Sequence, residues 1–438
     1  MPLQRKVYIQ PPPEAGCDAD EVWELLQALY GLVEAPDRWY AKVHDIFVRI
    51  MGGKQSKVDP AVFWWGTSED QAPDGVCSTH VDDFMFAGNP AWEKFFETTL
   101  RQEVDAGEIE DLSTLGEVTY AGIVLSKSTQ HGEPVVTMDL DRYATTLEPI
   151  IVAPGRLPTD VMSPAELLEF RALIGAMLWI VTQTRPTDAF AVSELAGFTA
   201  RPRVEHLAMA NQTLHKVQNI KYKMILRKLA GPLKLVVHTD ASWGNVGDGQ
   251  SQGGEYISLA EDTPKGARMN PVAWSSRRIR RAVRSTFASE TLSLVDGVDM
   301  ALLVRYLFDE LMGRTLVNKS NGRPLPVDMV LRNDGTFTQL PLQAVIDCRS
   351  ILDHVKSTKN TVTEKRLTVD LANLKDDLHK GVLRDLCWCT TDKQLADALT
   401  KRMAGTALVE AMNSGIMPDY SISVHSESGK IAEKTPPR

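Results

Sequence analysis

The chain has 438 residues, of which 43% are hydrophobic and 24% charged, and its formal net charge is −9. That length accommodates two to four globular domains, and no run approaches the about 18–20 apolar residues of a membrane span, so we expect no membrane partner. The first 14 residues lack the apolar core of a secretory signal, and five scattered cysteines make no disulfide framework. We therefore expect reduced thiols and an intracellular location, in the cytoplasm, the nucleus or both.

The first part of the chain mixes helices and strands. Apolar periodicity predicts helices over residues 22–32, 37–51 and 89–104. Strands are predicted over residues 57–66, 75–88 and 118–126. The strand over 75–88 bends into a hairpin that carries Asp82 and Asp83. Two adjacent acids at a hairpin tip are usually turn residues, so the motif alone does not assign them a function.

Residues 141–232 are predicted to be mainly helical. Ser163 has the character of a helix cap, Pro164 of the first helical position, and Glu166 lies where it completes a capping box. A second helix is predicted over 206–229, and Gly231-Pro232 ends the region.

The apolar, β-branched run over 233–243 predicts a central strand that delivers Asp240 to its end. A buried acid is costly unless it is paired or holds a metal. Three further acids occur downstream: Glu290 in a helical run, Asp347 at the end of a strand-like segment, and Asp397 in the sequence QLADALTK. This order of strand Asp, helix Glu, strand Asp and helix Asp resembles the ribonuclease H fold.

Four converging carboxylates can hold two Mg²⁺ or Mn²⁺ ions about 4 Å apart, which suits hydrolysis of an RNA phosphodiester. The alternative is that the four acids lie on separate surfaces and never meet. His238, two residues before Asp240, is interpreted as a core or hydrogen-bonded histidine.

Two basic segments contain no acid, although the whole chain is acidic. The first carries five arginines, Arg277, Arg278, Arg280, Arg281 and Arg284. The second, over 215–228, includes Lys216, Lys221 and Lys223. Such segments can follow the phosphates of a nucleic acid, here an RNA–DNA hybrid, or they are merely solvated basic loops.

The order of several motifs resembles the C-terminal part of the Pol polyprotein of copia-type LTR retrotransposons. The motifs are LQALYGLVEAPDRWY, THVDDFMFAG, VTYAGIVL, TRPTDAFAVS and QLADALTK. Departures are His80, where tyrosine is commonest in the family, and Thr187, where aspartate is usual. The resemblance implies that Asp82 and Asp83 supply part of a second two-metal site, for nucleotidyl transfer.

The resemblance implies a chain of α/β and α+β class with four parts. These are a partial reverse transcriptase palm over 1–140, a helical thumb or connection over 141–232, and a ribonuclease H-like domain with a mixed five-stranded sheet over 233–405. The fourth part, a tail over 406–438, is expected to be largely disordered because it is polar and has few apolar residues. The family's first metal-binding Asp lies upstream of the segment that matches Pro2–Pro13, so fingers and first catalytic strand are expected to be missing.

The resulting expectation is an enzyme, a metal-dependent ribonuclease H with an incomplete RNA-directed DNA polymerase. One alternative is a decayed or host-adopted remnant that binds nucleic acid or a partner without catalysis. A DNA integrase or resolvase core is a weaker alternative, since no zinc knuckle or DNA-binding motif accompanies the acids. The sequence does not indicate the oligomeric state.

Overall fold

The structure is a computed structural model that describes residues 5–18, 20–29, 31–66, 71–247, 249–263, 265–313, 340–357, 364–402, 406–420, 422–427 and 430–434. The chain is a mixed α/β protein, as predicted, and divides into two compact units. The first comprises Met1–Ile109 with Glu310–Thr315, and the second Glu110–Asp309 with Leu316–Arg438. The division after Ile109 does not coincide with the predicted border at residue 140. No helix in the described part of the chain is long and apolar enough to cross a membrane.

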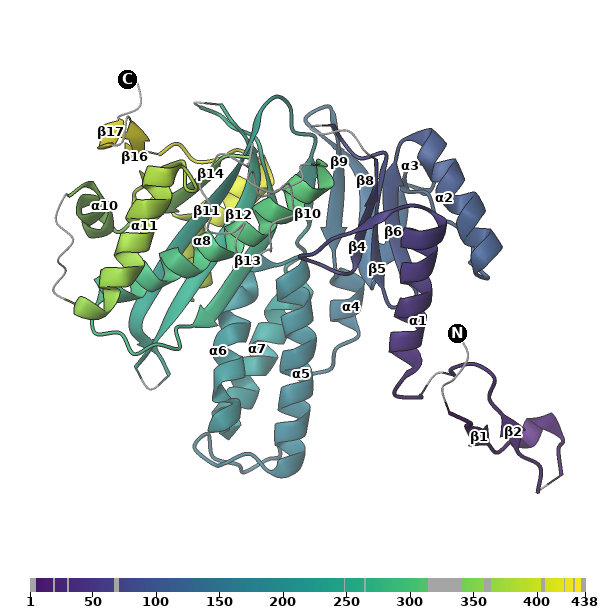
Figure 1. The fold of residues 1–438 in the computed structure, drawn as a ribbon. Coiled ribbons are helices and arrows are strands. Elements are labelled where there is room, and N and C mark those ends of the chain that lie inside the picture. Colours follow the sequence, from purple (N-terminus) through teal and green to yellow (C-terminus); the bar gives the residue numbers. More distant parts are fainter. Residues whose placement is uncertain are drawn as a thin grey trace. The chain divides into compact units, whose positions relative to one another are not determined.

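The first unit contains an antiparallel sheet in the order β3-β4-β5-β6 (Figure 1). Its strands are β3 (Lys54–Gln55), β4 (Val62–Trp65), β5 (Gly75–His80) and β6 (Asp83–Gly88). Its helices are α1 (Ala35–His44), continued by the π-helical turn η2 (Asp45–Ile50), and α2 (Pro90–Glu103). Residues 22–32 are not the predicted helix, because Trp23–Glu24 forms strand β2 and pairs with β1 (Tyr8–Ile9).

An aromatic core holds this sheet to its helices. Phe47, Phe63 and Phe96 are fully buried, and Trp92 of α2 packs among them. Gly75 and Gly88 are required beneath Trp92, because a Cβ atom at either position would lie 2.0 Å or 2.4 Å from its indole ring. Helix α2 can therefore approach the β5–β6 hairpin closely.

The second unit begins with an antiparallel sheet in the order β10-β9-β8-β7. The strands are β7 (Glu117–Tyr120), β8 (Ile123–Gln130), β9 (Glu133–Asp139) and β10 (Met224–Arg227). The predicted helix over 206–229 is therefore too long: α7 (Val204–Asn219) ends before β10, which pairs with β9. This pairing joins residues from both sides of the predicted border at 140 in one sheet.

The longer helices between β9 and β10 are α5 (Pro164–Gln183), α6 (Ala189–Gly197) and α7. The predicted capping box at the start of α5 is confirmed, because Ser163 and Glu166 each bond the other's backbone N–H. Arg185, after α5, is buried and donates to Asp188 at 2.9 Å, which fixes the turn into α6.

The largest sheet has seven strands in the order β13-β12-β11-β14-β15-β16-β17. They are β11 (Leu233–Val246), β12 (Gln250–Glu261), β13 (Met269–Arg278), β14 (Leu342–Ile346), β15 (Asp385–Trp388), β16 (Ile422–Glu427) and β17 (Lys430–Lys434). β11, β14 and β15 are parallel, whereas β12 and β13 pair antiparallel on the other side of β11. These first five strands form a mixed sheet.

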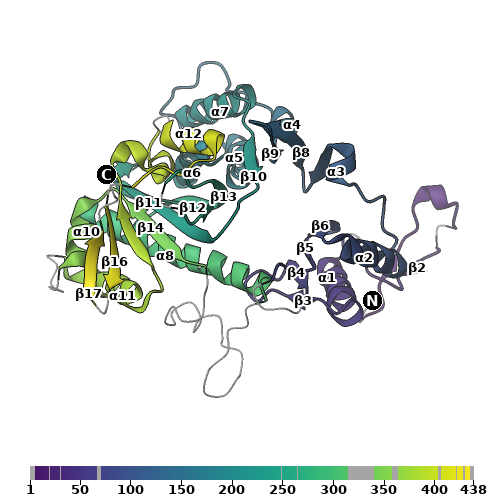
Figure 2. The same ribbon diagram turned by 90° about the horizontal axis from the view of Figure 1, so that it is seen from above.

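Both faces of this sheet are covered (Figure 2). One face packs on α8 (Thr286–Leu311), α10 (Arg349–Lys356) and α11 (Thr368–Lys380). The other packs on α5–α7, the 3₁₀ turn η7 (Leu395–Leu399) and α12 (Thr406–Ser414). The tail predicted to be largely disordered instead forms α12, β16 and β17, because Leu408 and Met412 are buried in the core and β16 pairs with β15.

Candidate metal centre

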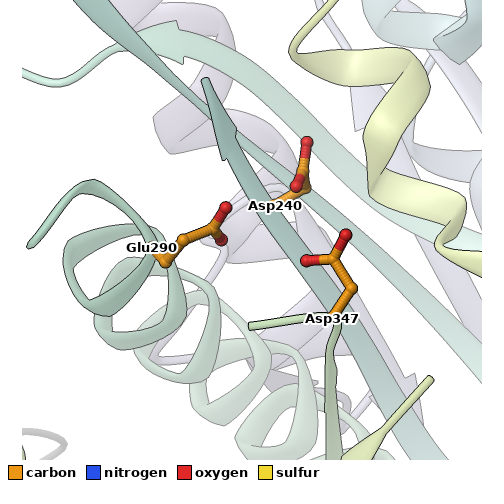
Figure 3. Close-up of side chains that lie close together, drawn as sticks. All are labelled: Asp240, Glu290 and Asp347. Carbon is orange, nitrogen blue, oxygen red and sulfur yellow. The ribbon is translucent and has the colours of Figure 1, made fainter. Parts of the chain in front are cut away.

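Three of the four predicted acids converge at one end of the large sheet (Figure 3). Asp240 lies in β11, Asp347 directly follows β14, and Glu290 is in the second turn of α8. One carboxylate oxygen from each lies within 4.8 Å of those of the other two. The alternative that these three acids lie on separate surfaces is therefore wrong.

The parallel pairing of β11 and β14 brings the two aspartates together. The last paired residues are His238 and Val345, and each aspartate comes two residues later in its chain. Glu290 reaches them from α8, which is fastened to β11 where Ser293 Oγ donates to the Asp240 carbonyl at 2.8 Å. Strand register and one side-chain hydrogen bond thus position all three acids.

The cluster concentrates negative charge away from water. Asp240 is 1% exposed and Glu290 6% exposed. Burial, followed by the charges of Asp240 and Asp347, raises the pKa of Glu290 to about 10. Burial also raises the pKa of Asp240 to about 6 and that of Asp347 above its usual value. Three mutually repelling carboxylates in a low-dielectric site are the arrangement that a cation relieves.

The oxygens present fit a hard divalent cation. Glu290 Oε2 is buried and has no hydrogen-bond partner among the described residues. Asp347 Oδ2 accepts from Thr391 Oγ1 at 2.9 Å, which orients that carboxylate from outside. Carboxylate oxygens are the ligands that Mg²⁺ and Mn²⁺ prefer, and oriented ligands with free oxygens can hold such an ion.

Asp397 does not belong to this cluster. It lies in η7, where its Oδ1 forms an ion pair with Lys401. Lys401 Nζ also lies 3.8 Å from Asp240 Oδ2. The predicted fourth metal ligand is thus joined to Asp240 through a lysine.

Sequence reasoning missed the residues that hold η7 against the site. Thr400 Oγ1 donates to Asp240 Oδ2, and Gln394 Nε2 donates to the Thr239 carbonyl at 3.0 Å. Gln394 and Thr400 are both buried. Their spacing from Asp397 was the available signal, because polar residues here recur every third position, which is the period of a 3₁₀ turn and puts them on one face.

Asp82 and Asp83 are exposed at the tip of the β5–β6 hairpin. Val81 between the strands has a φ of 56°, an unusual conformation for a β-branched residue, and Trp39 Nε1 donates to its carbonyl at 2.5 Å. Neither aspartate belongs to an acidic group with metal-like spacing among the described residues.

The predicted basic residues divide into paired and unpaired ones. The three lysines are half-exposed and each contacts an acid: Lys216 with Asp188, Lys221 with Asp141 and Lys223 with Asp139. Two arginines are likewise paired, Arg277 with Asp296 and Arg281 with Asp370.

The other three arginines differ in exposure. Arg278 is partly buried against Gly197, whereas Arg280 and Arg284 are exposed and have no ion pair within the described ranges. Arg280 and Arg284 lie in the segment between β13 and α8, shortly before Glu290.

Comparison with known proteins gives related sequences, whereas no protein-family model matches the chain. It is 22% identical over 291 residues to the putative transposon Ty5-1 protein of Saccharomyces cerevisiae, covering 64% of this chain and 90% of that protein. It is 24% identical over 417 residues to the retrovirus-related Pol polyprotein from transposon RE1 of Arabidopsis thaliana, covering 92% of this chain but 26% of the polyprotein. The chain thus spans about a quarter of that longer relative.

Two solved structures are similar to parts of the chain. A foamy viral protease-reverse transcriptase in complex with RNA/DNA hybrid has a TM-score of 0.41 at 13% identity, covering 83% of this chain and 39% of that one. LC11-RNase H1 in complex with RNA/DNA hybrid has a TM-score of 0.25 at 14% identity, covering 40% of this chain and 99% of that one.

Proposed function

We propose that this chain, whose homologues are the Pol polyproteins of copia-type retrotransposons, is a metal-dependent ribonuclease that cleaves the RNA strand of RNA–DNA hybrids. The observation that carries the proposal is the convergence of Asp240, Glu290 and Asp347 within 4.8 Å. The homology supports a reverse transcriptase and ribonuclease H type of function for the chain. The three acids supply a specific site for the ribonuclease H activity.

The three carboxylates would hold Mg²⁺ or Mn²⁺. A divalent ion at this place supplies an activated water and stabilises the leaving 3′ oxygen of the phosphodiester. The protein's own contribution is to orient the ligands: Thr391 fixes Asp347, and Thr400 with Gln394 holds η7 beside Asp240. Asp397 has a supporting place in this site, since Lys401 links it to Asp240.

The substrate would be held by phosphate contacts near the acids. Arg280 and Arg284 are exposed in the segment leading into α8, ten and six residues before Glu290. Unpaired guanidinium groups are suited to phosphate, and their attraction for a polyanion does not require a basic chain overall. A role inside the cell, within a longer Pol product, is consistent with this substrate.

The test is cleavage of an RNA–DNA hybrid labelled at the 5′ end of the RNA, in Mg²⁺ or Mn²⁺ and with EDTA as the metal-free reference. We expect RNA cleavage that Asp240→Asn and Glu290→Gln reduce at least a hundredfold. Glu410→Gln, an exposed acid on α12, is the matched control and should cleave normally. Equal cleavage by Asp240→Asn and the unchanged chain would refute the proposed site.

The second candidate function is nucleic-acid binding without catalysis. It is favoured for the first unit, because Asp82 and Asp83 do not form a metal-like cluster among the described residues. Hybrid binding with no cleavage under any divalent ion would support this candidate for the whole chain.

A further inference from the structure

Lys401 links the proposed metal ligands to the acid that stands apart from them. Its ammonium forms an ion pair with Asp397 and lies 3.8 Å from Asp240 Oδ2. The side chain is 34% exposed, so it is neither locked in the core nor free in solvent. A cation of the protein therefore stands between two carboxylates, at the place where an ion bridging Asp240 and Asp397 would bind.

The two sides of Asp240 have different partners. On one side Glu290 and Asp347 provide oxygens within 4.8 Å. On the other side Oδ2 accepts from Thr400 and faces Lys401. A divalent ion entering the first side meets free oxygens, whereas one entering the second side meets an ammonium at contact distance. Like charges at such separations repel strongly where the surroundings are partly buried.

We propose that Lys401 is a resident cation that competes with a second divalent ion for Asp240 and Asp397. The acids then bind one ion readily, and a second ion binds only when the lysine side chain moves away. Lys401 is a positioning residue in this arrangement, because its position determines how many ions the carboxylates hold. The inference depends on the proposed function, since it requires that these acids bind divalent ions at all.

The long lysine stem permits such a displacement. Lys401 follows Asp397 by four residues, and its ion pair with that residue is local to the end of η7. Breaking a partly exposed ion pair of this kind requires little free energy compared with breaking a buried one. The lysine can thus leave when a nucleic-acid phosphate or a high ion concentration favours the second ion.

The test counts bound Mn²⁺ by electron paramagnetic resonance, without nucleic acid, in the 438-residue chain and its variants. We expect one ion site in the unchanged chain. Lys401→Met, which keeps the stem and removes the charge, should bind a second ion at least tenfold more tightly than the unchanged chain does. Lys401→Arg should restore the single-site behaviour, which a merely structural role of the side chain would not predict.

The control Asp347→Asn should weaken the first ion in both backgrounds. Lys401→Gln provides a second uncharged variant with the same expectation, should the methionine variant not fold. Unchanged Mn²⁺ stoichiometry and affinity in folded Lys401→Met or Lys401→Gln would overturn this inference alone. Absence of Mn²⁺ binding in the unchanged chain and in the uncharged variants would overturn the proposed function as well.

Discussion

Glu290 on α8 and Asp240 on β11 hold their carboxylates within 4.8 Å of each other, although both side chains are at least nine-tenths buried. Among the described residues, Asp240 has Lys401 as an ion-pair partner and Glu290 has none. Lys401 lies 3.8 Å from Asp240 Oδ2 but also forms an ion pair with Asp397, and Glu290 Oε2 has no hydrogen-bond partner among the described residues. Close buried carboxylates of this kind destabilise the ion-free fold, which is the usual cost of a site prepared for a cation.

The first prediction concerns stability without metal. Glu290→Gln removes a buried acid that must either be charged beside Asp240 or take up a proton. We expect the free energy of unfolding of the variant in EDTA to be about 1–2 kcal/mol higher than that of the unchanged chain. In Mg²⁺ or Mn²⁺ the variant should not cleave RNA. Urea unfolding followed by circular dichroism measures the first effect. Glu410→Gln should change stability by less than about 0.5 kcal/mol, and a destabilised Glu290→Gln would contradict the argument.

The second prediction concerns Glu255, a fully buried acid on β12 outside the metal centre. Burial raises the pKa of Glu255 to about 7, although Arg277 on β13 opposes the shift. Ser293 Oγ lies 3.3 Å from one carboxylate oxygen, and the other oxygen has no hydrogen-bond partner in the described structure. The folded state therefore holds the proton more tightly than the unfolded chain does.

The direction in which pH changes the stability follows from this proton uptake. Between pH 4.5, the ordinary pKa of the group, and about 7, the unfolded chain binds fewer protons than the folded one. The contribution of Glu255 to the stability of the folded state is thus fully present below pH 4.5 and is lost as the pH rises through 7. We expect Glu255→Gln to match the unchanged chain at pH 4.5 and to exceed its stability by up to about 3 kcal/mol at pH 8. Urea unfolding at both pH values checks this, and an equal difference at both would contradict it.

The convergence of the three clustered acids was predictable because the order of the acids along the chain resembles that of the ribonuclease H fold. Along the chain there is first a β-branched run that ends in an acid, then a helical run with an acid in its early part, and then a second strand that ends in an acid. In that fold these three acids lie at the same end of a pair of parallel strands. Asp240, Glu290 and Asp347 occupy those positions. The predicted capping box at Ser163 rests on a local pattern of four residues and is confirmed.

The remaining features depend on partners distant in sequence. Met224–Arg227 continues the apolar spacing of α7 and becomes a strand only because β9 provides an edge to pair with. Lys401, four residues after Asp397, has the spacing of an ordinary surface ion pair, and only the fold brings Asp240 next to it. No local pattern could therefore distinguish Asp397 from the three clustered acids.

The third prediction separates the two basic segments. Arg280→Ala with Arg284→Ala removes exposed charges that have no ion pair among the described residues, whereas Lys221→Ala with Lys223→Ala removes charges paired with Asp141 and Asp139. We expect the arginine pair to weaken hybrid binding more and to lower the slope of log affinity against log salt by about 1–2. Fluorescence anisotropy of a labelled hybrid between 50 and 300 mM salt, roughly the range over which phosphate contacts are lost, measures both. Equal losses from the two double variants would favour the alternative of solvated basic loops.

The last prediction is that the 438-residue chain does not extend a primer even where it cleaves RNA. Nucleotidyl transfer needs carboxylates that hold two ions and align a 3′ hydroxyl with the incoming phosphate. Asp82 and Asp83 come from one hairpin, β5–β6, and the described residues bring no third acid to metal-like spacing with them. A primed RNA template with labelled deoxynucleotides and Mg²⁺ or Mn²⁺ measures the activity, and hybrid cleavage in the same preparation shows that the second unit is folded. Incorporation that depends on the template and is lost in Asp82→Asn would show that these two acids suffice in this chain, contrary to the argument.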